Sequence, residues 1–206
     1  MNINVGGRIR LERERQRLSL RELARRVGVS ASMLSQVETG RTRPSVSTIY
    51  SIATELGLSI DALLSEGAAV VAAVGRPVGA DLGGVLASVA VSQVVRPEDR
   101  RKLELGSGVT WEMLSDLLPH VVDFMLVTYE PGGRSSSSGK FTRHGGTEFA
   151  FMLRGTLKVQ AGVDEYVLRQ GDAMAFDSSQ PHLLVNEEAE PAVGVWFVLR
   201  QLPVPD

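Results

Sequence analysis

The first 64 residues repeat apolar side chains at the spacing of an amphipathic helix. One stripe recurs at i, i+3, i+4 and i+7: Leu20, Leu23, Ala24 and Val27. Ser19 stands three residues before Glu22, which is the capping box of a helix N-terminus. Gly28 follows the stripe and provides a helix stop. This pattern predicts a helix over residues 20–27.

The same region predicts further short helices. Ser30 can cap a helix in which Leu34 and Val37 face inward. Residues 44–57 begin with Pro-Ser, carry an apolar face and end in glycine, which indicates another helix. Residues 59–64 are sufficient for one more short turn. With one more helix before Ser19, we expect five short helices in residues 1–64.

Residues 90–206 change to short runs rich in β-branched and aromatic side chains. Glycine and proline turns separate these runs at intervals of about ten residues. The predicted strands are Val91–Val95, Val109–Met113, Phe124–Tyr129, Glu148–Leu153, Leu157–Val159, Glu165–Leu168, Ala173–Phe176, His182–Asn186 and Val193–Leu199. Short strands at this spacing predict an antiparallel sandwich or barrel.

The segment between these regions follows neither pattern. Residues 65–93 are rich in Ala and Val and contain five glycines, which interrupt long helices. The segment is a linker, or its apolar side chains pack against a partner subunit. The sequence thus predicts an all-α domain at residues 1–65, a linker at 66–92 and an all-β domain at 93–206.

Charge is divided unevenly between the two predicted domains. Residues 1–64 hold ten arginines and six acidic residues, a net charge of +4. Residues 65–206 hold twelve basic and eighteen acidic residues, a net charge of −6. A small basic module joined to a larger acidic one suggests that the first module meets a polyanion.

Composition excludes several classes of protein. The chain has no cysteine, which rules out a disulfide framework, a thiolate metal site and a cysteine nucleophile. Its longest apolar run, Ala68 to Val74, is far shorter than the ~20 residues that span a bilayer. No apolar run of a secretory signal follows the first residues. A cytoplasmic protein with no membrane partner is expected.

Several short motifs of the helical region stand at fixed spacing. They are Leu23-Ala24, Val29-Ser30, Leu34-Ser35-Gln36-Val37-Glu38, Gly40, Pro44-Ser45, Ile52-Ala53 and Leu56-Gly57. Through these residues the segment resembles the phage-repressor (Xre-type) helix-turn-helix domain. The resemblance implies that residues 30–37 form the recognition helix, which in such motifs enters the major groove of DNA.

The same resemblance implies a set of DNA contacts. Positions that face base edges are Ala31, Ser32 and Gln36, with Ser35 on the same outward side, and positions that approach phosphates are Ser30, Arg41 and Arg43. An exposed amide such as that of Gln36 can bond to adenine in a bidentate manner. Glu38 would be repelled by DNA, and the resemblance makes it an internal ion-pair partner of Arg13.

Two segments of the β region carry a second set of motifs. The first contains Gly139, His144, Glu148 and Gly155, and the second contains Gly171-Asp172, Asp177, Pro181, His182 and Asn186. They resemble the paired motifs of the cupin family, which is a jelly-roll barrel that commonly binds one metal ion. The resemblance places His144, Glu148 and His182 at three of the four ligand positions. Thr142, a poor metal ligand, stands at the fourth.

Two interpretations of these residues stay open. Two imidazoles and one carboxylate can hold one divalent metal ion with open positions for a small ligand. Alternatively, the same side chains are the polar lining of a pocket for an organic molecule. The predicted effector pocket contains Thr142, His144, Glu148, His182 and Asn186, of which His144, Glu148 and His182 are the candidate metal ligands.

These features favour a transcriptional regulator rather than an enzyme. We expect a homodimer, joined through the β domains, that binds an operator in double-stranded DNA and responds to a small-molecule effector. The alternative is a cupin metalloenzyme, an oxygenase or isomerase, fused to a DNA-targeting module. A third hypothesis is a DNA-binding protein whose barrel serves only for dimerisation.

Overall fold

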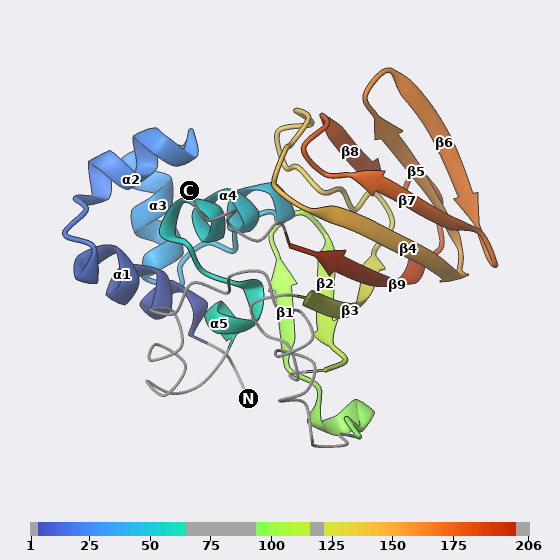
Figure 1. The fold of residues 1–206 in the computed structure, drawn as a ribbon, viewed down its shortest axis with the longest axis horizontal. Coiled ribbons are helices and arrows are strands. Elements are labelled where there is room, and N and C mark those ends of the chain that lie inside the picture. The colour runs from blue at the N-terminus through green and yellow to red at the C-terminus, as the bar shows by residue number, and fades with distance from the viewer. Residues whose placement is uncertain (1–3, 65–93, 116–121, 201–206) are drawn as a thin grey trace, which may run out of the picture.

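The computed structural model describes residues 4–64, 94–115 and 122–200 and separates helices from strands (Figure 1). In this part of the chain the helices are α1 (Val5–Arg15), α2 (Leu20–Val27), α3 (Ala31–Glu38), α4 (Val46–Leu56) and α5 (Ile60–Leu64). All five predicted helical segments are found, but α5 is a single turn of five residues, so α1–α4 build the domain. No helix among the described residues combines the length and apolar character needed to cross a bilayer.

Local sequence signals set the ends of the helices. The hydroxyl groups of Ser19, Ser30 and Ser45 each accept a hydrogen bond from the backbone N–H three residues later, which caps α2, α3 and α4. Gly28 ends α2 with a φ of 77°, a left-handed conformation that favours glycine. The chain therefore turns sharply from α2 into α3, as a helix-turn-helix requires.

A buried ion pair fixes α3 to α1. The Arg13 guanidinium donates to both carboxylate oxygens of Glu38, with Nε–Oε1 at 2.7 Å and Nη2–Oε2 at 2.9 Å. Both side chains are buried, and the hydrogen bond to Glu38 raises the pKa of Arg13 despite the opposing effect of burial. Glu38 thus has the internal role that was expected for it.

The strands form two antiparallel sheets. The described strands are β1 (Lys102–Leu105), β2 (Val109–Met113), β3 (Val122–Tyr129), β4 (Thr147–Arg154), β5 (Thr156–Ala161), β6 (Asp164–Arg169), β7 (Ala173–Asp177), β8 (His182–Val185) and β9 (Ala192–Leu199). One sheet has the order β1-β2-β3-β9-β4-β7, and the other has the order β6-β5-β8. A short 3-10 helix, Pro97–Asp99, precedes β1.

Two sequence predictions at the start of the β region need correction or lie outside the structure. Val94 and Val95 belong to no strand, so the predicted strand Val91–Val95 is wrong in its described part; residues 91–93 and the predicted linker 66–92 lie outside the described residues. The first strand is instead β1, whose side chains alternate between exposed and buried. Four residues with two charges give too weak a pattern for its prediction.

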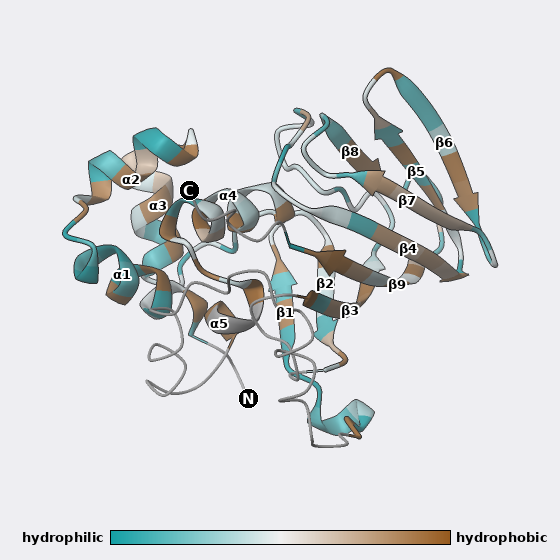
Figure 2. Cartoon of the chain, viewed as in Figure 1, coloured by the Kyte–Doolittle hydropathy of each residue, from teal (hydrophilic) through white to brown (hydrophobic). Residues whose placement is uncertain are grey.

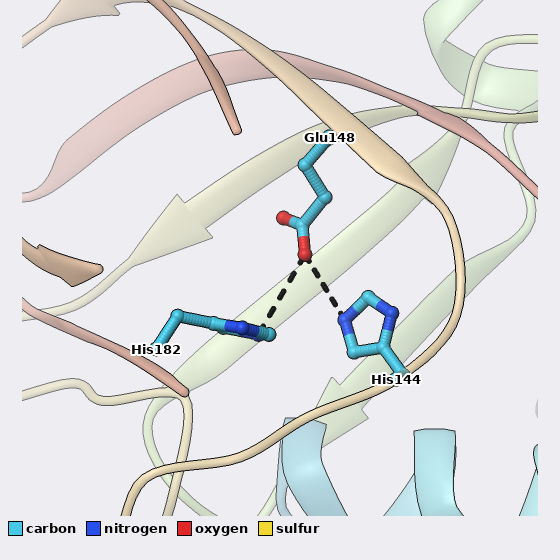
Figure 3. A group of neighbouring side chains, drawn as sticks. All are labelled: His144, Glu148 and His182. Carbon is cyan, nitrogen blue, oxygen red and sulfur yellow. Dashed lines mark ion pairs between the residues drawn. The ribbon is translucent and has the colours of Figure 1, made fainter. Parts of the chain in front are cut away.

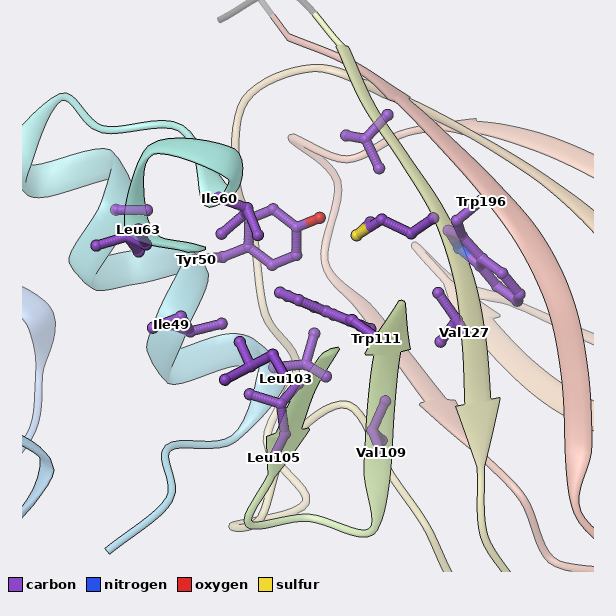
Figure 4. Packing of buried hydrophobic residues seen from close by; sticks show 14 of the residues in the cluster. Ile49, Tyr50, Ile60, Leu63, Leu103, Leu105, Val109, Trp111, Val127 and Trp196 are labelled. Carbon is purple, nitrogen blue, oxygen red and sulfur yellow. The ribbon is translucent and has the colours of Figure 1, made fainter. Parts of the chain in front are cut away.

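One hydrophobic cluster runs from the helices into the sheets. Buried residues of α4 and α5, such as Ile49 and Leu63, belong to the same cluster as Leu103 and Trp111 of the first two strands (Figure 4). Three hydrogen bonds cross the same boundary: Ser47 N to Ser135 O at 2.9 Å, Gly106 N to Pro44 O at 3.0 Å, and Arg200 Nη1 to Leu58 O at 3.3 Å. The helical domain is therefore packed directly on the sheet domain.

The Arg13–Glu38 pair predicts a large effect of one substitution. Glu38→Gln leaves a buried guanidinium without its charge partner, which costs about 3–5 kcal/mol of unfolding free energy. The matched control is Glu165→Gln, because Glu165 pairs with Lys158 at 3.1 Å on the exposed surface of the sheet domain and does not contact Arg13. That change costs about 1 kcal/mol or less in urea denaturation. Equal losses in the two variants would contradict the structural role of the buried pair.

Candidate functional site

The outward face of α3 presents the base-reading positions predicted from the sequence. Ser32 and Gln36 are exposed, while Ala31 and Ser35 are half-buried beside them. The Thr42 hydroxyl donates to Gln36 Oε1 at 2.9 Å, which orients the Gln36 side chain. An oriented amide on an exposed helix face suits bidentate contact with a base edge.

The predicted phosphate contacts lie at the two ends of α3. Ser30 is exposed and caps the helix, and Arg41 is exposed beyond its C-terminus. Arg43 is also exposed, but its Nη1 atom lies 2.6 Å from Glu104 Oε2 on β1. One of the candidate phosphate contacts is therefore paired with the sheet domain in this arrangement.

A small cavity lies between the two sheets and the helical domain. Its volume is about 20 Å³. The lining residues come from α4, both sheets and the loop between β3 and β4: Val46, Tyr50, Trp111, Met125, Val127, Tyr129, Ser135, His144, Glu148, His182, Leu184 and Trp196. The wall is thus mostly apolar and aromatic, with a few polar groups that converge on one point, as in ligand sites of known proteins.

The polar groups are the three candidate metal ligands. His144 precedes β4, Glu148 lies in β4 and His182 begins β8, so both sheets contribute to the cluster (Figure 3). Glu148 Oε1 lies 3.0 Å from His144 Nε2 and 3.7 Å from His182 Nε2. All three side chains are buried, and their ligand atoms lie within 4.8 Å of one another.

Neighbouring groups hold these side chains in place. Glu148 accepts hydrogen bonds from Ser178 Oγ at 3.1 Å and from Trp196 Nε1 at 3.2 Å. His182 Nδ1 lies 2.9 Å from the carbonyl oxygen of Gln180. Because a carbonyl only accepts, the proton of a neutral His182 resides on Nδ1, and Nε2 carries a lone pair toward Glu148.

Burial and charge determine the ionisation of the cluster. Burial of the Glu148 carboxyl acts to raise its pKa, but the hydrogen bond and charge of His144, with the charge of His182, lower the pKa below its usual value. Burial lowers the pKa of His182, against the opposing effect of Glu148. An ionised carboxylate and a neutral imidazole are the forms that bind metal ions.

This donor set fits a divalent cation. The lone pair of His182 Nε2 faces a carboxylate oxygen across 3.7 Å, and a cation between such atoms removes their repulsion. Two imidazoles and one carboxylate are the ligands of three-residue metal sites with open positions. The hydrogen bond from His182 Nδ1 to a carbonyl is the outer-shell contact that orients a metal-binding histidine.

Two predicted pocket residues do not line the cavity. The Thr142 hydroxyl donates to the backbone carbonyl of His182 at 3.3 Å. Asn186 is fully buried, and its amide donates to the carbonyl oxygens of Tyr129 and Glu190, both at 2.9 Å. The cupin motif thus places both residues near the pocket, where they hold backbone segments together.

Sequence reasoning missed the contribution of α4 to the cavity. Val46 and Tyr50 are both buried and stand one helical turn apart, next to the stripe that faces the helical core. A helix that is apolar on two faces is buried on both sides. This second stripe is the signal in the sequence that predicts contact with the other domain.

Two family models match the chain. The helix-turn-helix model matches residues 9–63, and the cupin domain model matches residues 125–198. The chain is thus composed of an N-terminal Xre-type helix-turn-helix domain and a C-terminal cupin domain.

The chain is similar to several proteins named as transcriptional regulators or repressors. The HTH-type transcriptional regulator PuuR of Escherichia coli is 27% identical over 186 residues, which cover 89% of this chain and 88% of that protein. The immunity repressor protein of Bacillus phage phi105 is 34% identical over 64 residues, covering 31% of this chain and 44% of that protein. A solved HTH_3 family transcriptional regulator from Vibrio cholerae has the same fold, with a TM-score of 0.63 and 23% identity over 97% of this chain and 96% of that chain.

Proposed function

We propose that this DNA-binding transcriptional regulator binds its operator as a homodimer and uses its cupin pocket to bind a small-molecule effector. The chain is homologous to PuuR-type regulators. The observation that carries the proposal is the exposed face of α3. Ser32 and Gln36 project from a helix that is capped at its start and fixed to α1 by a buried ion pair. Such rigid support is what a base-reading helix needs for specificity.

Charge and size support the DNA-binding role and the dimer. The net charge of +4 in residues 1–64 attracts the phosphate backbone, whereas residues 65–206 carry −6. A single module of this size buries roughly 600–1,000 Å² on DNA. Two modules that read half-sites about one helical turn apart provide the remaining contacts. The operator we infer is accordingly a near-palindrome.

An exposed apolar face of the six-stranded sheet suits a second copy of the chain. Two cross-strand rows cover it: Phe124, Phe197, Phe149 and Ala175 in one, and Leu126, Val195, Phe151 and Ala173 in the other. Phe149 and Phe151 are 44% and 47% exposed, and β9 is strongly hydrophobic along its length (Figure 2). From β3 to β7 neither row contains a charged residue, and the second row meets the charged pair Glu112 and Lys102 only beyond β3. Such apolar patches mark protein interfaces.

The effector role rests on the cupin pocket. His144, Glu148 and His182 would hold a divalent metal ion, which supplies open coordination positions for an oxygen or nitrogen atom of the effector. Tryptophan and tyrosine side chains line the cavity around the cluster. Binding there changes operator affinity by about 5- to 150-fold, the usual range of allosteric coupling.

A cupin enzyme is the second candidate, because a metal held by three residues is also a catalytic arrangement. The two functions differ in the fate of the bound molecule. A regulator returns its effector unchanged on denaturation, whereas an enzyme converts it. Mass spectrometry of the molecule released from the protein distinguishes them.

Gln36→Ala tests the base-reading role of α3. The substitution lowers affinity for the preferred operator by about 1–3 kcal/mol and leaves binding to random DNA nearly unchanged. Fluorescence anisotropy with both DNA molecules at one salt concentration measures the difference. Gln170→Ala, in an exposed turn of the sheet domain, is the control with no expected effect. Equal losses on operator and random DNA would contradict base reading.

The double variant His144→Ala/His182→Ala tests the metal site. Removing two ligands weakens Co²⁺ binding by about 100-fold or more, since even outer-shell changes cost about 10- to 100-fold. Thr142→Ala is the control, because the Thr142 hydroxyl bonds to a backbone carbonyl rather than to the cluster. Equilibrium dialysis of the full chain against Co²⁺ gives the affinities. Unchanged affinity in the double variant excludes this site as the metal site.

Phe151→Glu tests the proposed dimer face. A carboxylate in the middle of the apolar rows must be desolvated on association, so the variant elutes as a monomer where the unmodified chain is a dimer. Tyr166→Glu is the matched control, because Tyr166 is an equally exposed aromatic residue on the other sheet. Light scattering after size exclusion gives both masses. A Phe151→Glu variant that remains dimeric places the interface elsewhere.

A further inference from the structure

A tyrosine of the DNA-binding domain forms one wall of the cupin pocket. Tyr50 lies on α4, yet its ring stacks on the His144 imidazole with centroids 4.1 Å apart and planes 8° apart. The edge of the same ring system meets Trp111 with centroids 5.3 Å apart (Figure 4). Only 7% of Tyr50 is exposed. The pocket is therefore a composite of both domains.

With Tyr50 in this position the pocket is too small for an organic molecule. The cavity of about 20 Å³ has room for a water molecule or one ion. Pockets for organic ligands have volumes of roughly 300–1,000 Å³. An organic ligand therefore reaches His144 only after the Tyr50 ring has left.

Tyr50 is unable to leave by a simple side-chain rotation. Its helix is also buried against the helical core along the adjacent stripe, where Ile49, Ile52 and Ala53 pack. Rotation of a bulky ring within a close-packed boundary requires the surrounding elements to separate. Withdrawal of Tyr50 thus implies movement of α4, and with α4 the whole DNA-binding domain, away from the barrel.

The contacts that resist this movement include the shared hydrophobic cluster, two hydrogen bonds (Ser47 N to Ser135 O and Arg200 Nη1 to Leu58 O) and a local set at the β1–β2 turn. Gly106, in the turn between β1 and β2, donates its backbone N–H to Pro44 O at 3.0 Å. A Cβ atom on Gly106 would lie 2.3 Å from the carbonyl oxygen of Arg43, so the close approach of the two domains requires glycine there. The Arg43–Glu104 pair beside it is exposed and contributes about 1 kcal/mol or less.

We propose that Tyr50 is an internal ligand of the cupin pocket, which a small molecule with a planar ring replaces against His144 and thereby releases the DNA-binding domain from the barrel. This inference rests on the proposed effector function and deepens it. Release of α4 also frees Arg43 from Glu104, so a candidate phosphate contact depends on pocket occupancy. The ligand class follows from the shape of the vacated slot, which is bounded by the face of the His144 imidazole and by the Trp111 indole at a steep angle to it.

Fluorescence of the two tryptophans of the chain reports on the pocket directly. Trp111 and Trp196 both line the cavity and are 2% and 4% exposed. Acrylamide, a small neutral quencher, reaches them only when the barrel mouth opens. Tyr50→Ala removes the plug, and Gly106→Ala separates the domains while Tyr50 is retained. Each raises the quenching constant by about twofold or more, as local opening exposes buried groups.

Two controls complete the quenching experiment. Tyr50→Phe keeps the ring and stays at the value of the unmodified chain, as does Tyr166→Ala, which removes an exposed tyrosine from β6. Near-ultraviolet circular dichroism confirms that each variant is folded at the temperature of the measurement. Quenching that is unchanged in Gly106→Ala overturns the coupling of Tyr50 to domain position. Quenching that is unchanged in Tyr50→Ala overturns the plug itself.

The probe for ligand replacement is p-cresol, the tyrosine side chain as a free molecule. It binds Tyr50→Ala and Gly106→Ala at least about tenfold more tightly than it binds the unmodified chain, in which Tyr50 competes with it. Tryptophan emission gives the dissociation constants, and Tyr50→Phe remains as weak as the unmodified chain. Equal affinity in all four proteins overturns the proposal. Neither experiment uses DNA or metal. Failure of the proposed function would therefore appear in the DNA-binding and Co²⁺-binding tests, and failure of this inference would appear in the quenching and p-cresol tests.

Discussion

Burial of α4 on two adjacent faces is the constraint on which the arrangement of this protein depends. One face completes the core of the helix-turn-helix domain, and the other carries Val46 and Tyr50 into the mouth of the barrel. Because a close-packed helix does not adjust its two faces independently, any change at the barrel mouth is transmitted to the helical domain. Helix α3, which we propose as the recognition helix, is joined to this unit through α1 and the Arg13–Glu38 pair.

The polar cluster behind Tyr50, which consists of His144, Glu148 and His182, differs from this close packing because it carries charge. The pKa of the buried Glu148 carboxyl is lowered, so the group carries a negative charge. Burying that charge costs free energy unless a cation or hydrogen-bond donors compensate it. Ser178 and Trp196 provide two donors, and the lone pair of His182 Nε2 leaves a position where a cation is favourable. An apolar wall and a charged centre together make a site in which occupancy has a large energetic effect.

The sequence predicted those parts of the fold that depend on local pattern. Capping serines and glycine stops located α2–α4, and alternating runs located most strands, because these signals act within a few residues. The short strand β1 forms by pairing with β2, and local pattern does not encode that pairing. Residues 94–95 have a strand-like sequence but belong to no strand. Motif spacing brought His144, Glu148 and His182 together, whereas the position of Tyr50 required knowledge of how the domains pack.

The most direct measurement of the central claim is the distance between the domains with the pocket empty and filled. Spin labels attached through Arg21→Cys on α2 and Val163→Cys beyond β5 are the only thiol-bound groups in this cysteine-free chain, and both positions are exposed. Double electron–electron resonance should give one narrow distance distribution without ligand and a second, longer population with saturating p-cresol. Saturation of the tryptophan signal by p-cresol with an unchanged distance distribution would contradict the account.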